Sequence, residues 1–146
     1  MTTGTSHADT LDRLRRALLL ILAASLFGVG TELLLLEHFE DTPQYIPLGL
    51  IVVSLLVIGW HAVGKSRASV QVLRVLMLGA LVSGPVGIIL HYRGNAEFEL
   101  EMTPALGGLA LIKAAVLGAT PLLAPGTMSL LGVLGLLYTW RHPAAN

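Results

Sequence analysis

The chain contains four long stretches that are almost free of charged residues. The first lies between Arg16 and Glu37 and contains a single charge, Glu32. The other three contain none and cover residues 42–64, 75–92 and 114–140. An apolar run of about 18 or more residues is long enough to cross ~30 Å of hydrocarbon as a helix. Helices are favoured because lipid offers no hydrogen-bond partners to an open backbone.

The composition agrees with this pattern. Of the 146 residues, 54% are hydrophobic and 12% are charged, whereas soluble domains carry about 25% charged residues. Nine basic and nine acidic residues give no net charge and hence no basic excess for nucleic acid. The absence of cysteine excludes disulfides, thiolate metal sites and a cysteine nucleophile. We predict an all-α integral membrane protein with one membrane domain over residues 1–146, surrounded by the lipid bilayer.

The apolar stretches predict a four-transmembrane-helix bundle with spans near residues 15–36, 45–63, 70–91 and 122–140. Between the last two spans, Pro104 is suited to the first turn of a helix. The segment near 105–119 is too short to span comfortably, so we expect a short outer helix that is interfacial or re-entrant. A fifth span is the alternative. The strict alternation of Glu97 to Met102 favours an extended segment.

The positions of Lys and Arg predict the orientation. Four spans place most of the basic residues on one side, namely Arg13, Arg15, Arg16, Lys65, Arg67, Arg74 and Arg141. The other side receives Arg93, Lys113 and most of the carboxylates. Because short cytoplasmic loops are rich in Lys and Arg, we predict a multi-pass protein with both termini in the cytoplasm.

Glu32 is the charged residue that lies deepest in a predicted span. It precedes Glu37 by five residues, which places it roughly 7 Å deeper at 1.5 Å per residue. Gly28 and Ala24 share its helix face at a spacing of four, and small residues favour helix contacts. An ionisable group at this depth is a candidate proton acceptor, cation ligand or partner of a basic group. A position among the headgroups, or a hydrogen bond to another helix, is the simpler interpretation.

A polar cluster follows the first span. Glu37, His38, Glu40 and Asp41 offer ligand types that suit divalent metals, with His91 or Glu97 as distant partners. Consecutive residues do not converge on one ion, however, and a solvated acidic loop explains the pattern more simply. We predict neither a bound metal nor a cofactor. The candidate polar site consists of Glu32, Glu37, His38, Glu40, Asp41 and His91.

Small residues recur at helical spacing and predict where helix backbones approach one another. Packing within the bundle and docking of another subunit both fit these stripes. The residues assigned to helix packing are Ala24, Gly28, Gly79, Ser83, Gly87, Gly132 and Gly135.

Residues 32–41, 91–102 and 123–143 together resemble a group of small bacterial multi-span proteins of uncharacterised function. The resemblance implies the bacterial cytoplasmic (inner) membrane and no particular mechanism. No phosphate loop, Ser/His/Asp constellation or HExxH motif occurs, so no catalytic residue is assigned. We expect a non-enzymatic structural or accessory protein that packs with itself or in a larger membrane complex. The alternatives are a small transporter or sensor, with an outer proton or cation site around Glu32, Glu37, His38 and His91, and a membrane enzyme that uses this cluster.

Overall fold

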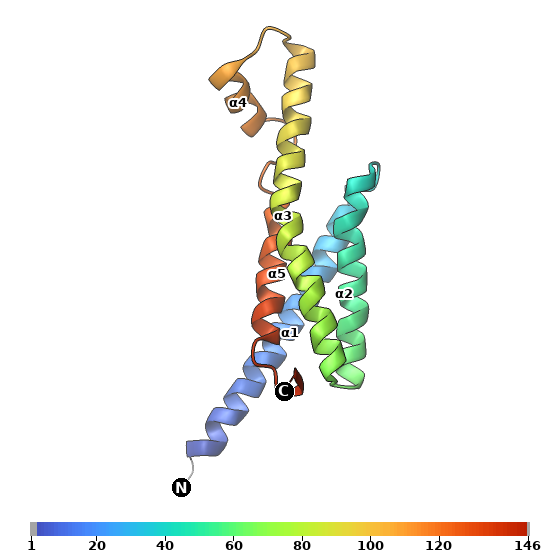
Figure 1. The fold of residues 1–146 in the computed structure, drawn as a ribbon, viewed down its shortest axis with the longest axis vertical. Coiled ribbons are helices and arrows are strands. Elements are labelled where there is room, and N and C mark those ends of the chain that lie inside the picture. Colours follow the sequence, from blue (N-terminus) through green and yellow to red (C-terminus); the bar gives the residue numbers. More distant parts are fainter. Residues whose placement is uncertain (1–2, 146) are drawn as a thin grey trace.

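The computed structural model describes residues 3–145, and its regular structure is helical (Figure 1). The five α-helices are α1 (Thr3–Leu35), α2 (Tyr45–Val63), α3 (Arg67–Met102), α4 (Gly108–Val116) and α5 (Gly126–Thr139). Two 3-10 turns, η1 (Thr42–Gln44) and η2 (Pro143–Ala145), precede α2 and follow α5. No strand occurs between residues 3 and 145, which confirms the predicted helical class.

Three helical segments within residues 3–145 are long and apolar enough to cross a membrane: Asp9–Leu35, Thr42–Val63 and Arg67–Met102. α2 has the bounds predicted for the second span, 45–63. α5 is shorter than the predicted span 122–140, and its 14 residues extend only about 21 Å. The helix begins directly after Pro125, since a proline in the interior of a helix would remove a backbone hydrogen bond.

α3 continues well beyond the predicted end of the third span at residue 91. The predicted extended segment Glu97 to Met102 is wrong, because these residues form the last turns of α3. Glu, Leu and Met are strong helix formers, and no proline interrupts the chain between Pro85 and Pro104. The short helix predicted near 105–119 is present as α4, although it starts at Gly108 rather than beside Pro104.

α3 is the central helix of the bundle. α5 and α2 pack against it, α4 folds back onto its far end, and α1 contacts α2 and α5 (Figure 1). The largest fully buried apolar side chains come from α1, α2 and α3: Leu22, Leu26, Ile51, Leu73 and Met77. The α1–α2 pair and the α3–α5 pair diverge with distance from the α2–α3 turn (Figure 1).

Glycines bring α3 and α5 into close contact. A Cβ atom built at Gly132 would lie 2.6 Å from the backbone nitrogen of Leu81 and 2.7 Å from the backbone oxygen of Met77. The Ser129 hydroxyl donates a hydrogen bond to the Leu81 carbonyl over 2.9 Å. A Cβ atom at Gly84 would collide with the Ser129 side chain. The two helices therefore meet along their backbones, as small residues allow.

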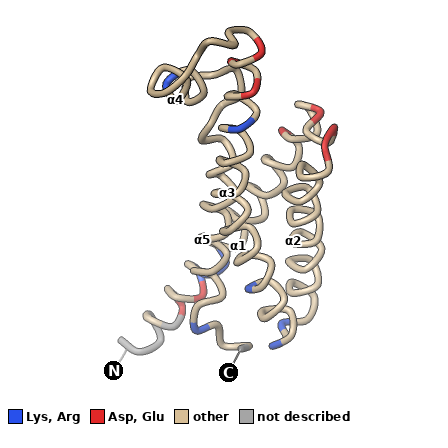
Figure 2. The backbone as a smooth tube through the Cα atoms, turned by 45° about the horizontal axis from the view of Figure 1, so that its top comes forward, with Lys and Arg blue, Asp and Glu red and all other residues tan. Residues whose placement is uncertain are grey.

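The charges divide the bundle into two ends (Figure 2). We call the end with the α2–α3 turn and the C-terminus the basic end, because most Lys and Arg residues gather there. The opposite end carries the α1–α2 loop, the far part of α3 and α4, and we call it the acidic end. Lys113 in the last turn of α4 is one of the few cations at the acidic end.

Candidate functional site

The α1–α2 loop holds four of the six residues predicted to form a polar site. Glu37, Glu40 and Asp41 are exposed there. The Gln44 side chain folds the loop back by accepting hydrogen bonds from the backbone nitrogens of Glu40 (2.7 Å) and Asp41 (3.1 Å). No group of three histidine, aspartate or glutamate side chains among the described residues is placed to hold a metal ion. The loop thus does not gather the predicted ligands around one point.

The structure does bring His38 and His91 together, from the loop and from α3. Their ring centroids are 6.1 Å apart and the rings are tilted by 59°. His91 Nδ1 is 3.0 Å from the Pro121 carbonyl and donates a hydrogen bond to it. Burial, with a smaller contribution from His91, lowers the pKa of His38 below its usual value. The pair therefore links the two diverging halves of the acidic end and favours the neutral form of His38.

Asn95 fixes the fold of the chain between α4 and α5. Its side chain is 2% exposed, and Nδ2 donates to the carbonyls of Ala115 (2.9 Å) and Thr120 (2.8 Å). Oδ1 accepts from the Thr120 nitrogen over 3.0 Å. A Cβ atom at Gly118 would lie 2.7 Å from Asn95 Cγ. The sequence analysis missed Asn95, because the predicted third span ended before it.

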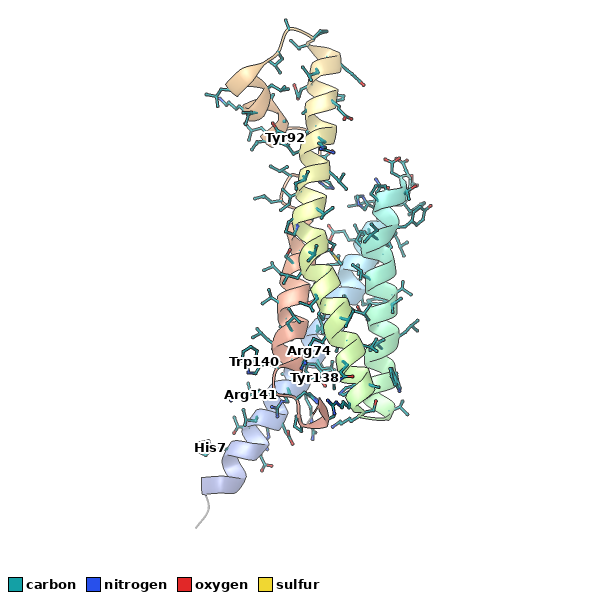
Figure 3. All side chains as sticks on the ribbon, viewed as in Figure 1. His7, Arg74, Tyr92, Tyr138, Trp140 and Arg141 are labelled. Atoms are coloured by element: carbon teal, nitrogen blue, oxygen red, sulfur yellow. The ribbon has the colours of Figure 1, made fainter. Side chains whose placement is uncertain are left out.

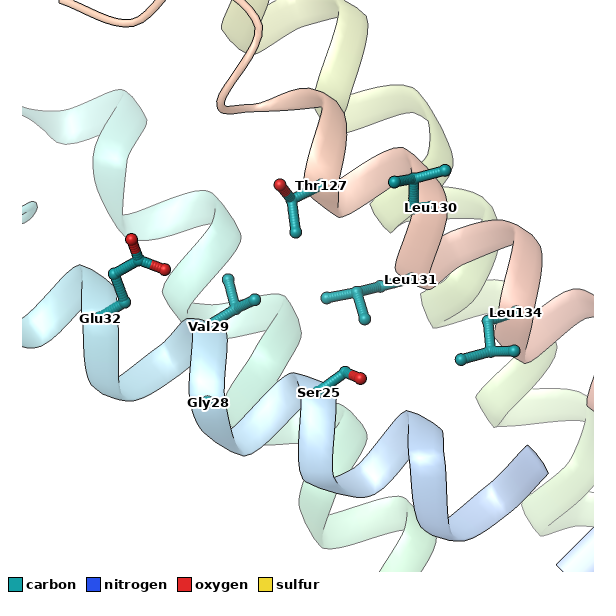
Figure 4. A pocket seen from close by; sticks show the side chains of 8 residues that line it. All are labelled: Ser25, Gly28, Val29, Glu32, Thr127, Leu130, Leu131 and Leu134. Atoms are coloured by element: carbon teal, nitrogen blue, oxygen red, sulfur yellow. The ribbon is translucent and has the colours of Figure 1, made fainter. Parts of the chain in front are cut away.

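A groove separates α1 from α5 and has a volume of about 580 Å³ (Figure 4). Its α1 wall consists of Ser25, Gly28, Val29 and Glu32. Its α5 wall consists of Thr127, Leu130, Leu131 and Leu134. We call the groove lined by these eight residues the α1–α5 groove. The volume falls in the range of small-molecule sites, about 300–1,000 Å³.

Glu32 is the one charged residue of the α1–α5 groove. Its side chain is exposed and makes no ion pair or hydrogen bond with another described residue. Gly28, one turn earlier, leaves open space, since a Cβ atom there would meet nothing within 4 Å. Glu32 thus faces an apolar groove rather than the His38–His91 pair.

A buried polar cluster at the basic end was also missed by the sequence analysis. His61 of α2 is 1% exposed, Ser69 of α3 is fully buried and Tyr138 of α5 is 4% exposed. His61 Nδ1 lies 2.7 Å from the Ser69 hydroxyl, and His61 Nε2 lies 2.8 Å from the Tyr138 hydroxyl. The Ser69 hydroxyl itself donates to the Ser66 carbonyl over 2.8 Å. The network therefore assigns the imidazole proton to Nδ1, and Nε2 accepts from tyrosine.

His142 covers this cluster from the C-terminal segment. It is 6% exposed, and its ring centroid is 5.1 Å from those of both His61 and Tyr138. We call His61, Ser69, Tyr138 and His142 the basic-end latch. The sequence alone could have suggested that His61 and Tyr138 lie near each other, because a four-span topology places the last residues of the second and fourth spans at the same depth.

Arg74 and Arg15 hydrogen-bond to the end of α5 and to the segment that follows it, beside the latch; Figure 3 labels Arg74 near Tyr138 and Arg141. Arg74 Nη2 donates to the Thr139 carbonyl over 2.8 Å, and Arg15 Nη2 donates to the Arg141 carbonyl over 3.3 Å. The last carbonyls of a helix lack partners within the helix and carry partial negative charge. Arg74 satisfies such a carbonyl at Thr139 and joins α3 to the end of α5, whereas Arg15 joins α1 to the segment that follows α5.

The predicted packing residues occupy different environments. A Cβ atom at Gly79 would lie 3.1 Å from Leu50 of α2, and one at Gly87 would lie 2.5 Å from Pro125. Ser83 donates to the Ala80 carbonyl of its own helix over 2.9 Å. Gly135, like Gly132, faces α3, where a Cβ atom would collide with Met77. Ala24 and Gly28 are exposed on α1.

Comparisons of the chain with protein-family models, with curated proteins and with solved structures find no match. Its class therefore follows from its own helices. Three of them have the length and apolarity of membrane spans, which indicates a membrane protein.

The latch is expected to weaken on acidification. Burial lowers the pKa of His142 most, followed by the positive charges of His61, Arg15 and Lys65, whereas Asp12 acts in the opposite direction. Because the pKa of His142 is lower in the folded than in the unfolded chain, the unfolded chain binds more protons, and the free energy of unfolding decreases as the pH falls. We expect this loss to begin as the pH falls through the usual histidine value of 6.5.

The measurement is the unfolding midpoint in neutral detergent at about pH 8 and about pH 5. His142→Gln should reduce the difference between the two midpoints, and Glu40→Gln in the exposed loop serves as the control. An unchanged difference in the His142 variant would contradict the assignment.

Proposed function

We propose that this chain is a non-enzymatic integral membrane protein that assembles with a second copy of itself through the exposed face of α2. The observation that carries the proposal is a continuous stripe of exposed residues along α2. The α2 stripe consists of Gly49, Val52, Leu56, Gly59 and Val63, and all five residues are exposed.

The spacing of the α2 stripe alternates between three and four residues. That alternation is the seam along which two helices pack in a left-handed coiled coil. Val52 is 54% exposed, Leu56 68% and Val63 93%, so the seam faces outward. The stripe contains no charged group. Two identical faces therefore meet without repulsion, as the two-fold symmetry of a dimer requires.

Glycines within the stripe support a helix partner rather than lipid. A Cβ atom at Gly49 or Gly59 would meet nothing within 4 Å. A glycine inside a helix costs about 1 kcal/mol relative to alanine, and here no contact within the chain compensates that cost. Gly132 of α5, by contrast, allows a close contact with α3. If a helix of a second copy packed against the stripe, Gly49 and Gly59 would likewise allow two helix backbones to approach closely.

The proposal includes four membrane crossings. The segment from Thr120 to Thr139 runs alongside α3 and is joined to it at both ends, by hydrogen bonds to Asn95 and Arg74. Those 21 steps along α3 measure about 32 Å at 1.5 Å per residue, which is close to the ~30 Å hydrocarbon core. α5 and the non-helical residues before it would form the fourth crossing. Non-helical backbone is tolerated at such depth where protein groups satisfy it, as Asn95 does here.

The charge distribution supports an orientation with both termini in the cytoplasm, since the basic end carries the α2–α3 turn and the C-terminus. The bacterial inner membrane remains the proposed location on the sequence resemblance given above. In this orientation α4 and the acidic loop lie outside, and the α4 helix rests on α3.

Cross-linking tests the α2 interface cleanly, because the natural chain contains no cysteine. Leu56→Cys introduces a thiol in the middle of the stripe, and Val75→Cys introduces one on the exposed surface of α3. The two side chains are 68% and 67% exposed. They lie at similar distances from the α2–α3 turn, seven residues before Val63 and eight after Arg67.

We expect Leu56→Cys to form cross-linked dimers in membranes and Val75→Cys to remain monomeric. Adding Gly59→Ile to the Leu56→Cys chain should lower the dimerisation constant about tenfold, which corresponds to a loss of about 1.4 kcal/mol, and should reduce the cross-linked fraction accordingly. Equal cross-linking at both positions, or none at either, would rule out this interface.

A further inference from the structure

We propose that the α1–α5 groove binds an amphiphilic organic cation, with its ammonium group beside the Glu32 carboxylate and its aliphatic part along the leucines of α5. This inference concerns a ligand site and does not rest on assembly through α2, which uses a different helix face.

The charge of the α1–α5 groove selects the ligand's charge. Glu32 is its one ionisable residue, and no described cation lies within ion-pair distance of it. A carboxylate at membrane depth is costly unless a partner compensates it. An ammonium group would provide that partner through a charge-assisted hydrogen bond.

The absence of a cation from the lining of the groove argues against a zwitterionic phospholipid as the occupant. A phosphate group would need a cation or several hydrogen-bond donors, and the groove has no cation. Its remaining side-chain donors are the hydroxyls of Ser25 and Thr127. A ligand with a net positive charge and no phosphate therefore fits the lining best.

The polarity of the groove runs in the direction that a membrane amphiphile adopts. Glu32 lies three residues before the end of α1, at the acidic end of the groove, and Thr127 is the α5 residue of the lining that lies nearest to that end, opposite Val29 (Figure 4). Ser25 and Leu134 mark the deeper end, seven residues away on each helix, or about 10 Å at 1.5 Å per residue. A headgroup near the surface with an apolar chain below it matches this order.

Room for an aliphatic chain comes from the residues opposite the leucines. Gly28 has no side chain, and a Cβ atom there would meet nothing within 4 Å. Leu130 is 71% exposed, whereas its neighbour Leu131 is 4% exposed and closes the floor of the groove. The groove is open along its side, so a ligand dissolved in the bilayer reaches it without passing through the bundle.

Equilibrium dialysis with the reconstituted full-length chain tests the inference. The protein is placed in nanodiscs of phosphatidylcholine, and empty nanodiscs correct for partition into lipid. Decylamine, which is cationic at neutral pH, is the probe, and decanol is its uncharged counterpart. We expect saturable binding of decylamine above the empty-disc background, with a stoichiometry of about one per chain, and much weaker binding of decanol.

Three variants separate the site from general electrostatics. Glu32→Gln should lower decylamine affinity about tenfold or more, as expected for a lost hydrogen bond to a charged group, and should leave decanol unchanged. Glu40→Gln removes the same charge from the exposed loop and should bind like the natural chain. Gly28→Leu keeps the carboxylate but fills the groove, so it should weaken the binding of decylamine. Circular dichroism and size-exclusion profiles confirm that each variant folds.

Equal decylamine binding by the natural chain and Glu32→Gln would overturn the inference. Failure of decylamine to exceed the empty-disc background would also overturn it. Cross-linking through Leu130→Cys, combined with absent decylamine binding, would assign the groove to a second copy instead. The α2 cross-linking experiment is independent of these outcomes, because Leu56 lies outside the α1–α5 groove.

Discussion

Gly132→Leu is expected to separate α5 from α3 and to lower the free energy of unfolding by about 3 kcal/mol or more, at the upper end of overpacking costs. A Cβ atom at this position would lie 2.6 Å from Leu81 N and 2.7 Å from Met77 O. Both neighbours are backbone atoms of a helix, so neither can rotate away as a side chain would. Because α5 lacks the length to span alone, its place in the bundle depends on this contact.

The measurement is the free energy of unfolding in mixed micelles titrated with dodecyl sulfate. Gly94→Leu is the matched control, since Gly94 also lies within a helix but a Cβ atom there meets nothing within 4 Å. We expect the control to change stability by less than about 1 kcal/mol, with a favourable contribution from helix propensity. Similar destabilisation by both substitutions would mean that the α3–α5 contact is not close at Gly132.

The apolar helices were predictable because a helix that crosses the hydrocarbon core needs a long run of apolar residues, which is visible in the sequence. A charge-free run of sufficient length predicts a helix whatever its neighbours are, and α2 begins and ends where the run predicts, at Tyr45 and Val63. The prediction failed where local pattern competes with helix propensity. Glu97 to Met102 alternates like a strand, but its glutamates, leucine and methionine favour the helix that arrives from the preceding turns.

The polar contacts were less predictable, because each joins residues far apart in the chain. Asn95 bonds to Thr120 across 25 residues, and His61 bonds to Tyr138 across 77. Neither pair has a local spacing that marks it. Glu32 and the acidic loop, in contrast, are conspicuous in the sequence because charged residues are rare in this apolar chain. The structure places Glu32 in a groove and leaves the loop carboxylates exposed.

The two ends of the bundle are held together to different degrees. At the basic end, buried hydrogen bonds from His61 join α2, α3 and α5, and Arg15 adds α1. At the acidic end the helices diverge (Figure 1), and the ring contact of His38 with His91 spans the gap. The α1–α5 groove lies toward this less constrained end.

His61→Ala is expected to lower the free energy of unfolding by about 3 kcal/mol, which combines a cavity with a lost hydrogen bond. The imidazole is 1% exposed and fills the space between Ser69 and Tyr138. Ser69 keeps its bond to the Ser66 carbonyl, so the orphaned group is the buried Tyr138 hydroxyl. Tyr138→Phe removes the same bond without a cavity and should cost about 1 kcal/mol.

The two substitutions form a double-mutant cycle that isolates the imidazole–phenol bond. Because both residues share this bond, the double variant should lose less stability than the sum of the single variants, by about 0.5–1.5 kcal/mol. His38→Ala at the acidic end is the control, and its half-buried ring should cost less than His61 does. Additive effects of His61→Ala and Tyr138→Phe would show that the two side chains do not interact. If the two side chains are coupled, amide hydrogen exchange at the end of α5 should be faster in the His61→Ala variant than in the natural chain. The reason is that α5 would lose its hydrogen bond to α2 at this point.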